Sequence, residues 1–117
     1  MLFFVLVSSV ALGQTTYVVL EPEEFKEQVK DREVQLVDVR TPEEFAEGHI
    51  EGAKNINFHS NDFLPQFTKL DKEKTLYIYC KSGNRSGKAA RELSEIGFTK
   101  IVDLKGGFLA WKELTND

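Results

Sequence analysis

The chain has 117 residues, of which 41% are hydrophobic, and it carries a formal net charge of −4. This length and apolar content predict one domain with a sizeable core, and scattered charges of both signs argue against a nucleic-acid partner, which needs a basic face. One cysteine and two histidines exclude an intrachain disulfide and a cysteine-rich zinc site.

Residues 2–12 are uncharged and strongly apolar, and they run into small residues before Gln14. This pattern is typical of a secretory signal peptide cleaved after Gly13, and the stretch is shorter than the ~20 apolar residues that span a bilayer. We therefore expect an exported protein, periplasmic or secreted, whose mature chain does not insert into a membrane. Because no basic residue precedes the apolar run, two alternatives stay open: a misplaced start codon, or the buried first strand of a cytoplasmic protein.

The first elements after this segment are a strand and a short helix. Residues 16–20 are rich in β-branched side chains and predict the strand. Pro22 suits the first turn of a helix, in which Phe25 and Val29 lie one turn apart and face inward.

Residues 34–39 are apolar enough for a strand buried on both faces, as parallel strands are. A capping box follows, with Thr41 as N-cap and Glu44 reaching back to it. Asp38 and Arg40 therefore lie where a strand ends, at the edge where open α/β sheets bind ligands. We interpret both as supporting charges, with Arg40 paired to Glu44 or Asp38 bonded to a backbone amide, in preference to reactants.

Residues 48–53 form a turn-rich connection to a short strand at residues 54–57. His49 lies in this connection, and a role in fastening the loop is favoured over a role as general base. Residues 61–70 place Phe63, Leu64, Phe67 and Leu70 at helical spacing and predict a core-facing helix, with Phe58 and Phe63 as candidate pocket walls.

The stretch at residues 76–86 contains the strongest chemical signal. An apolar strand at residues 76–79 ends at Cys80, a polar loop with Lys81 and Arg85 follows, and a helix is expected from Gly87. Unpaired amides at a helix start and nearby cations, among them Lys88, favour a thiolate, so we interpret Cys80 as a nucleophile. The alternative is a small buried hydrophobe at a strand end, but such a residue gains nothing from a cationic loop.

The last elements are a helix, a strand and a closing helix. Ala89, Ala90, Leu93 and Ile96 form one helical face that ends at Gly97, and residues 101–104 form the last strand. Gly106 and Gly107 predict a tight turn and a close backbone approach to the pocket. The closing helix places Phe108, Trp111 and Leu114 at three-residue intervals.

Several motifs in order resemble those of single-domain rhodaneses, the thiosulfate and persulfide sulfurtransferases. They are Asp38-Val39-Arg40, Pro42-Glu43-Glu44-Phe45, Gly48-His49-Ile50-Glu51-Gly52-Ala53, Asn55-Ile56, Cys80-Lys81-Ser82-Gly83-Asn84-Arg85-Ser86 and Gly106-Gly107-Phe108 with Trp111. The resemblance implies an α/β fold, with a mainly parallel central sheet flanked by helices on both faces, that occupies residues 14–117 after a signal peptide at residues 1–13.

The resemblance also implies sulfur transfer through a persulfide on the cysteine. It makes Cys80 and Arg85 catalytic, while Asp38 and Arg40 support the loop. The substrate-binding residues are Lys81, Ser82, Gly83, Asn84 and Ser86. The expected partners are thiosulfate or a persulfide as donor and a thiol, a protein thiol or cyanide as acceptor, with no cofactor, no metal and no nucleic acid.

Two other functions compete with this interpretation. Related cysteine phosphatases and arsenate reductases enclose five residues between cysteine and arginine to hold a tetrahedral oxyanion, whereas Cys80 and Arg85 enclose four. The shorter loop favours a single bound sulfur. A non-catalytic binding module is the second competitor, although such modules often lose the cysteine that this chain retains.

Overall fold

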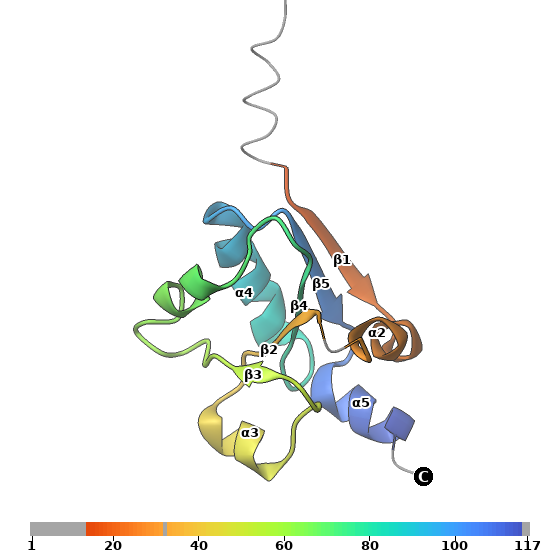
Figure 1. The fold of residues 1–117 in the computed structure, drawn as a ribbon. Helices are drawn as coiled ribbons and strands as arrows, with labels where there is room; N and C mark the ends of the chain where they lie inside the picture. Colours follow the sequence, from red (N-terminus) through yellow and green to blue (C-terminus); the bar gives the residue numbers. More distant parts are fainter. Residues whose placement is uncertain (1–13, 32, 116–117) are drawn as a thin grey trace, which may run out of the picture.

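The structure, a computed structural model, describes residues 14–31 and 33–115. The predicted signal peptide at residues 1–13 lies outside the described residues. The described part forms five strands and five helical segments (Figure 1). In chain order they are β1 (Thr16–Leu20), α2 (Pro22–Val29), β2 (Gln35–Asp38), α3 (Pro42–Glu47), β3 (Lys54–Asn55), η1 (Pro65–Lys69), β4 (Leu76–Tyr79), α4 (Asn84–Glu95), β5 (Lys100–Leu104) and α5 (Gly107–Thr115).

All strand pairs are parallel, and the strand order is β1-β5-β4-β2-β3. Each connection between parallel neighbours therefore crosses over the sheet, which is the arrangement that βαβ units impose. β4 occupies the centre, with all four of its residues buried. The predicted α/β class and the mainly parallel sheet are confirmed. β1 and β4 have the predicted bounds, and β2, β3 and β5 differ from theirs by one or two residues at their ends.

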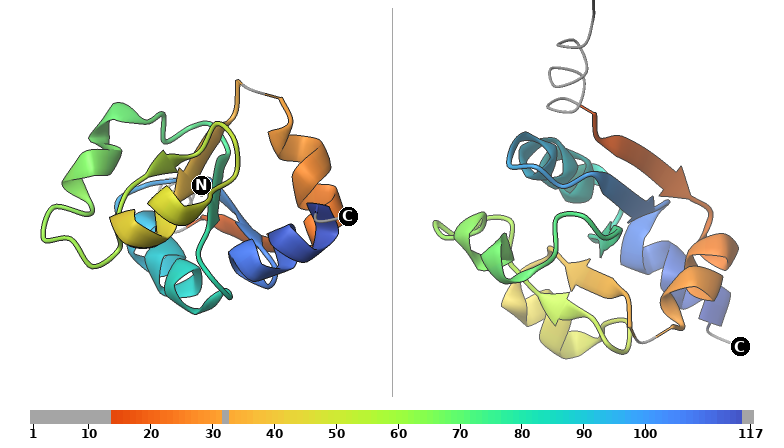
Figure 2. Two further views of the ribbon diagram at one scale, coloured as in Figure 1. Left: turned by 90° about the horizontal axis from the view of Figure 1, so that it is seen from below. Right: turned by 45° about the horizontal axis from the view of Figure 1, so that its top comes forward.

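Helical segments cover both faces of the sheet, with α4 and η1 on one side and α2 and α5 on the other (Figures 1 and 2). Alternation along β4 divides the core between these faces, because neighbouring side chains of a strand point to opposite sides. Ile78 packs in the cluster beneath α4, and Tyr79 packs with Phe25 of α2 in the other cluster. The predicted inward positions of Phe25 and Val29 are confirmed.

The segment at residues 61–70 differs from the predicted helix. It consists of turns and the 3-10 helix η1, which begins at Pro65. The amide of Phe67 bonds to the carbonyl of Leu64 at 3.0 Å, and that of Leu70 bonds to Phe67 at 3.0 Å. Pro65 has no amide proton to donate to a carbonyl one turn back, and the residues after it form the tighter 3-10 ladder in place of an α-helix. Phe63 and Phe67 are buried all the same.

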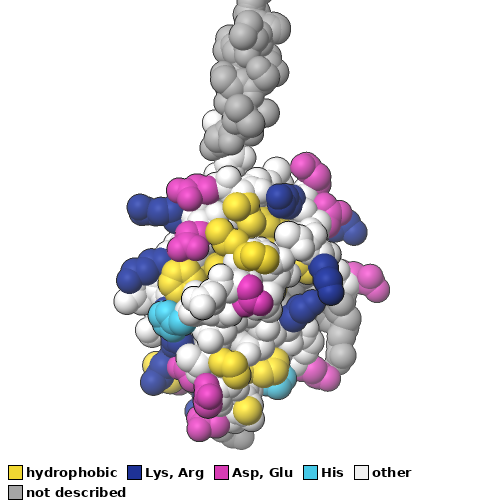
Figure 3. Space-filling model, turned by 90° about the vertical axis from the view of Figure 1, so that its left-hand side faces the viewer, with side chains coloured by type: hydrophobic (Ala, Val, Ile, Leu, Met, Phe, Trp, Pro, Cys, Tyr) yellow, Lys and Arg dark blue, Asp and Glu magenta, His cyan; other side chains and the backbone are white. Residues whose placement is uncertain are grey.

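The surface carries charges of both signs. Figure 3 shows the side of the molecule that lies to the left in Figure 1, with Lys and Arg side chains interspersed with Asp and Glu around scattered hydrophobic groups. No helix of the described residues is both long and apolar enough to cross a bilayer.

Candidate active site

Cys80 follows the last residue of β4, at the carboxyl edge of the sheet, and its side chain is 1% exposed. Two backbone amides point at its sulfur: Gly83 N lies 3.0 Å from Sγ and Ser86 N lies 3.3 Å from it. The Ser86 hydroxyl oxygen is also 3.3 Å from Sγ. Amide donors aimed at one sulfur atom stabilise negative charge on that atom.

The helix after the loop begins earlier than predicted, at Asn84 instead of Gly87. Gly83 is its N-cap and has a φ of 111°, a conformation that glycine adopts without strain. The amide of Gly87 bonds to the Gly83 carbonyl at 3.3 Å and closes the first turn. Arg85 and Ser86 therefore belong to the first turn of α4, which directs the Ser86 amide at the sulfur and brings the positive end of the helix dipole to Cys80.

The start of α5 is hydrogen-bonded to the cysteine loop, residues 80–86. Phe108 N donates to the carbonyl of Cys80 at 2.8 Å, and Leu109 N donates to that of Lys81 at 3.1 Å. A Cβ at Gly107 would lie 2.4 Å from the carbonyl carbon and oxygen of Lys81, so only glycine fits there. Gly106 and Gly107 both have positive φ. The two roles predicted for this glycine pair, a turn and a close approach, are both confirmed.

Arg85 forms a two-pronged ion pair with Glu44 of α3, so the Glu44 carboxylate partly balances the positive charge that Arg85 brings to the cysteine loop. Nη1 lies 2.8 Å from Oε1 and Nη2 lies 3.0 Å from Oε2. The hydrogen bonds from Arg85, together with those from Thr41, lower the pKa of Glu44 to about 2. The same pair raises the pKa of Arg85. This contact ties the first turn of α4 to α3, and the predicted capping box of Thr41 and Glu44 is present beside it.

Asp38 and Arg40 form a buried ion pair, with Arg40 Nη2 2.6 Å from Asp38 Oδ2. The side chain of Arg40 is 5% exposed and that of Asp38 is 0% exposed. The predicted pairing of Arg40 with Glu44 is wrong, since Glu44 is taken by Arg85. The predicted bond from Asp38 to a backbone amide is confirmed, because Arg40 N donates to Oδ1 at 2.9 Å. Arg40 also donates to the Gly48 carbonyl at 2.7 Å and lies 4.3 Å above the Phe108 ring. The pair therefore holds the α3–β3 loop and α5 beside the cysteine loop.

The outer residues of the loop lie between two surface hollows. Lys81, Ser82 and Asn84 are exposed. One hollow is lined by Arg40, Glu44, Glu47, Gly48, Lys81, Phe108, Leu109 and Lys112. The other is lined by Phe58, Gly83, Asn84, Gly87, Lys88, Arg91 and Glu92. Phe58 is thus a wall residue, as predicted, whereas Phe63 packs edge-on against it in the core, with ring centroids 5.2 Å apart.

His49 fastens its own loop. Its Nδ1 lies 2.8 Å from the carbonyl oxygen of Phe45, and its ring stacks on the Phe45 ring at 3.6 Å between centroids. Both contacts fit the loop-fastening role that the sequence favours. His49 thus holds the end of α3 to the turn that follows it.

Asp103 is a site residue that the sequence reasoning missed. It lies in β5, is 2% exposed, and accepts a hydrogen bond from the Tyr17 hydroxyl to Oδ2 at 2.6 Å. Burial raises the pKa of Asp103 to about 6, while the hydrogen bond from Tyr17 and the polar interaction with Ser86 act in the opposite direction. The sequence offered one signal for this residue. Asp103 is an acidic residue between the apolar residues Val102 and Leu104 of a predicted strand, and a buried carboxyl group is unfavourable unless it has partners.

Within residues 14–31 and 33–115, no group of three or more His, Cys, Asp or Glu side chains could hold a metal ion.

A family model described as a rhodanese-like domain matches residues 21–114. Thiosulfate sulfurtransferase GlpE of Pseudomonas aeruginosa is 35% identical over 100 residues, which cover 85% of this chain and 87% of that protein. The uncharacterized protein YqhL of Bacillus subtilis is 39% identical over 106 residues, covering 91% and 81%.

Solved structures agree with the sequence comparisons. The crystal structure of a rhodanese-related protein from Thermoplasma volcanium superposes with a TM-score of 0.73 at 30% identity, over 86% of this chain and 96% of that one. The likeness therefore extends over most of the chain.

Proposed function

The chain belongs to the rhodanese-like domain family, and from this premise we propose that it transfers sulfane sulfur through a persulfide on Cys80. The observation that carries the proposal is the pair of amides, Gly83 N and Ser86 N, aimed at Sγ. A thiolate gains stability from these donors, and so does the anionic terminal sulfur of a persulfide if it occupies the same concavity.

The reaction has two steps. The Cys80 thiolate attacks the outer sulfur of thiosulfate, a Sγ–S bond forms, and the S–S bond of the donor breaks with its electron pair leaving on sulfite. The acceptor, a thiolate or cyanide, then attacks the outer sulfur of the persulfide and releases Cys80 as thiolate. This is covalent, ping-pong catalysis.

The polar residues around the loop receive distinct roles in this proposal. Lys81 is exposed beside the loop and meets an anionic donor. Gly83 and Ser86 bind the sulfur, while Ser82 and Asn84 form the exposed outer rim of the loop. Arg85, held by Glu44, fixes the loop and contributes positive potential, and the Asp38–Arg40 pair supports it from β2.

The test is a thiosulfate:cyanide assay combined with intact mass spectrometry after treatment with thiosulfate. We expect thiocyanate production and one added sulfur atom on the wild-type chain, and neither with Cys80→Ser, whose circular dichroism should be unchanged. Absence of the added mass from the wild type would overturn the proposal in favour of a binding module. Hydrolysis of an aryl phosphate in place of sulfur transfer would identify a phosphatase.

We also propose that residues 1–13 are a signal peptide. The support is the apolar composition of residues 2–12, and the first strand of the described residues begins at Thr16. N-terminal sequencing of the protein expressed in a bacterial host with an export pathway should find Gln14 first. An intact Met1 on all of the protein would contradict export.

A further inference from the structure

Asp103 is a buried carboxyl group that the proposed sulfur transfer leaves without a role. It lies on β5 next to Leu104, and alternation along this strand places its side chain on the same face as Ile101, which packs beneath α4. An isolated carboxylate in such a position is unfavourable unless it has partners. Its partners therefore indicate what it does.

The two carboxyl oxygens of Asp103 have different surroundings. Oδ2 accepts the 2.6 Å hydrogen bond from Tyr17. Oδ1 is buried and has no hydrogen-bond partner among the described residues. No described lysine or arginine forms an ion pair with this side chain. A buried acceptor oxygen without a donor is rare, and the Ser86 hydroxyl is among the groups that interact with this carboxyl group.

Ser86 connects this carboxyl group to the nucleophile. Its Oγ lies 3.3 Å from Cys80 Sγ, and in the structure its hydroxyl donates a long hydrogen bond of 3.3 Å to the Gly83 carbonyl. A hydroxyl both accepts and donates, and its proton rotates to suit its partners. Turning that proton from Gly83 to Asp103 Oδ1 gives an unbroken path from the sulfur to the carboxyl group.

The other charges near this path leave it intact. Arg85 interacts with Cys80 but is paired with Glu44, and Tyr17 interacts with both Asp103 and Cys80. On α4, Arg91 lines the same hollow as Tyr17 without pairing with Asp103. Within the described part of the chain, no Lys or Arg forms an ion pair that would hold Asp103 in its charged form.

We propose that Asp103 is the proton acceptor for the Cys80 thiol, with the Ser86 hydroxyl as the bridge between them. The S–H bond breaks as Ser86 Oγ takes the proton, and the proton that Oγ already carried passes to Oδ1. The product is a thiolate beside a neutral carboxylic acid. This proposal rests on the proposed sulfur transfer, and it assigns Asp103 a positioning role that acts through Ser86.

The physical consequence is that the two groups share one proton. A thiolate and a carboxylate close together in the interior repel each other, so the site carries a single negative charge over a range of pH and titrates in two coupled steps. Between the steps the ratio of thiolate to thiol is set by internal transfer and does not depend on pH. An anionic persulfide on Cys80 holds the proton on Asp103 in the same way.

The first test is the pH profile of Cys80 alkylation by iodoacetamide. The alkylation rate reports the fraction of Cys80 that is thiolate, and it does so whether or not the protein transfers sulfur. For the wild type we expect a rate that rises through the first step, levels off, and rises again. For Asp103→Asn we expect one step with a rise of about tenfold per pH unit, and a faster rate at neutral pH because the repulsion is gone. A wild-type alkylation profile with a single step, of the same shape as the profile of Asp103→Asn, would overturn the proposal.

Tyr17→Phe is the companion variant, since it keeps Asp103 and removes only a hydroxyl from a partly exposed ring. The Tyr17 hydrogen bond stabilises the carboxylate and lowers the pKa of Asp103, so its loss should move the first step of the alkylation profile to higher pH. This variant keeps the proposal testable if Asp103→Asn does not fold. An unmoved first step would show that the step does not belong to Asp103.

The second test counts protons released, with an indicator dye, when thiosulfate loads Cys80 at a pH above the first step of the wild type and below the single step of Asp103→Asn. We expect the wild type to release about one proton fewer per persulfide than Asp103→Asn, because Asp103 keeps that proton. Equal release by the two proteins would refute the shared proton while leaving sulfur transfer in place. Failure of both to form a persulfide would instead refute the proposed function.

Discussion

The contact between Arg85 and Glu44 joins two helices whose paired residues lie 41 positions apart, and Glu44→Gln tests its contribution. The substitution removes one charge and keeps the shape of the side chain. Glutamine still offers an oxygen to the Thr41 amide, which lies 3.0 Å from Glu44 Oε1. It also turns an amide N–H₂ group toward the guanidinium, so the two-pronged ion pair is lost while the cap of α3 persists.

The magnitude follows from the pKa of Glu44. A fall from the ordinary value of 4.5 to about 2 corresponds to about 3 kcal/mol of stabilisation of the charged form. The two side chains are 22% and 27% exposed, so solvent screens part of this interaction, and we expect Glu44→Gln to lower the free energy of unfolding by about 1–2 kcal/mol at neutral pH.

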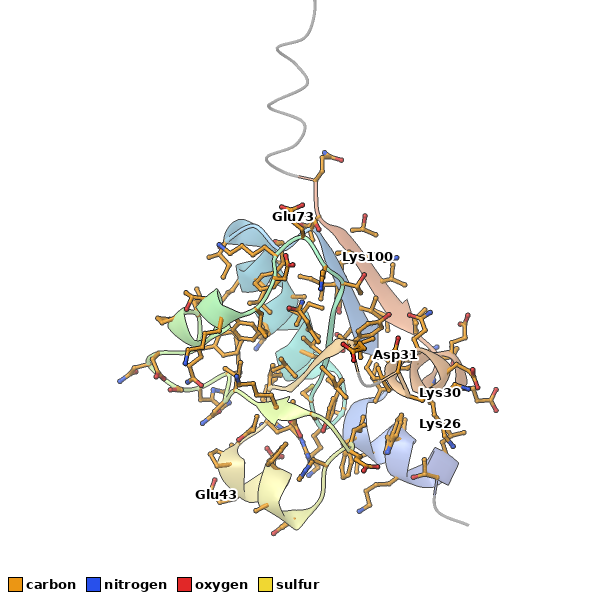
Figure 4. The ribbon with its side chains drawn as sticks, viewed as in Figure 1. Lys26, Lys30, Asp31, Glu43, Glu73 and Lys100 are labelled. Carbon is orange, nitrogen blue, oxygen red and sulfur yellow. The ribbon has the colours of Figure 1, made fainter. Side chains whose placement is uncertain are left out.

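Urea unfolding of the purified protein measures this loss, with Glu43→Gln as the matched control. Glu43 lies in the same turn of α3, is exposed, and projects from the outer side of the helix (Figure 4). Its substitution should change the free energy of unfolding by less than about 0.5 kcal/mol. Equal losses for the two variants would refute the argument that the ion pair with Arg85 stabilises the fold.

The dependence on pH gives a second check with a definite sign. Because the folded-state pKa of Glu44 lies below the unfolded value, its contribution is complete above the unfolded value and disappears as the pH falls toward 2. The difference between wild type and Glu44→Gln should therefore shrink to less than half its neutral value by about pH 3. A difference that stays constant down to that pH would contradict the assignment.

Three further substitutions test the supports of the cysteine loop. Gly107→Ala should lower the free energy of unfolding by at least about 2 kcal/mol, because the new Cβ meets the Lys81 carbonyl at 2.4 Å and the backbone has positive φ. Gly87→Ala, whose Cβ meets only the Tyr17 hydroxyl at 3.9 Å, is the control and should be neutral or stabilising in the same unfolding assay. Asp38→Asn leaves Arg40 buried without its counter-charge and should destabilise the fold by about 3–5 kcal/mol, seen as a lower melting temperature; an unchanged temperature would contradict the support role. Arg85→Ala should slow both thiocyanate production and Cys80 alkylation at neutral pH, and an unchanged alkylation rate would limit Arg85 to a structural role.

Local patterns in the sequence were enough for the main features of the fold and for the position of Cys80 in it. The capping box of Thr41 and Glu44 is a contact over three residues, and it forms as predicted. The strand that ends at Cys80 and the glycine-containing loop after it are also local, because strand alternation and turn chemistry act over a few residues. Where local rules compete, as at Pro65 and at the start of α4, the predicted helix bounds are wrong.

The partners of the charged residues were decided only by the tertiary structure. Glu44 was expected to meet Arg40, four residues away, yet it meets Arg85, while Arg40 turns back to Asp38. Tyr17 reaches Asp103 across 86 positions of sequence. Sequence spacing limits which charged side chains can form ion pairs within one helix or loop. The crossover connections of a parallel sheet determine which loops, distant in sequence, lie side by side at its carboxyl edge. The chain by itself therefore determined that Cys80 follows a buried strand and precedes a glycine-containing loop. The packing of β1, β5, α3 and α5 around that loop decided which groups contact the sulfur, the Arg85 guanidinium and the Asp103 carboxyl group.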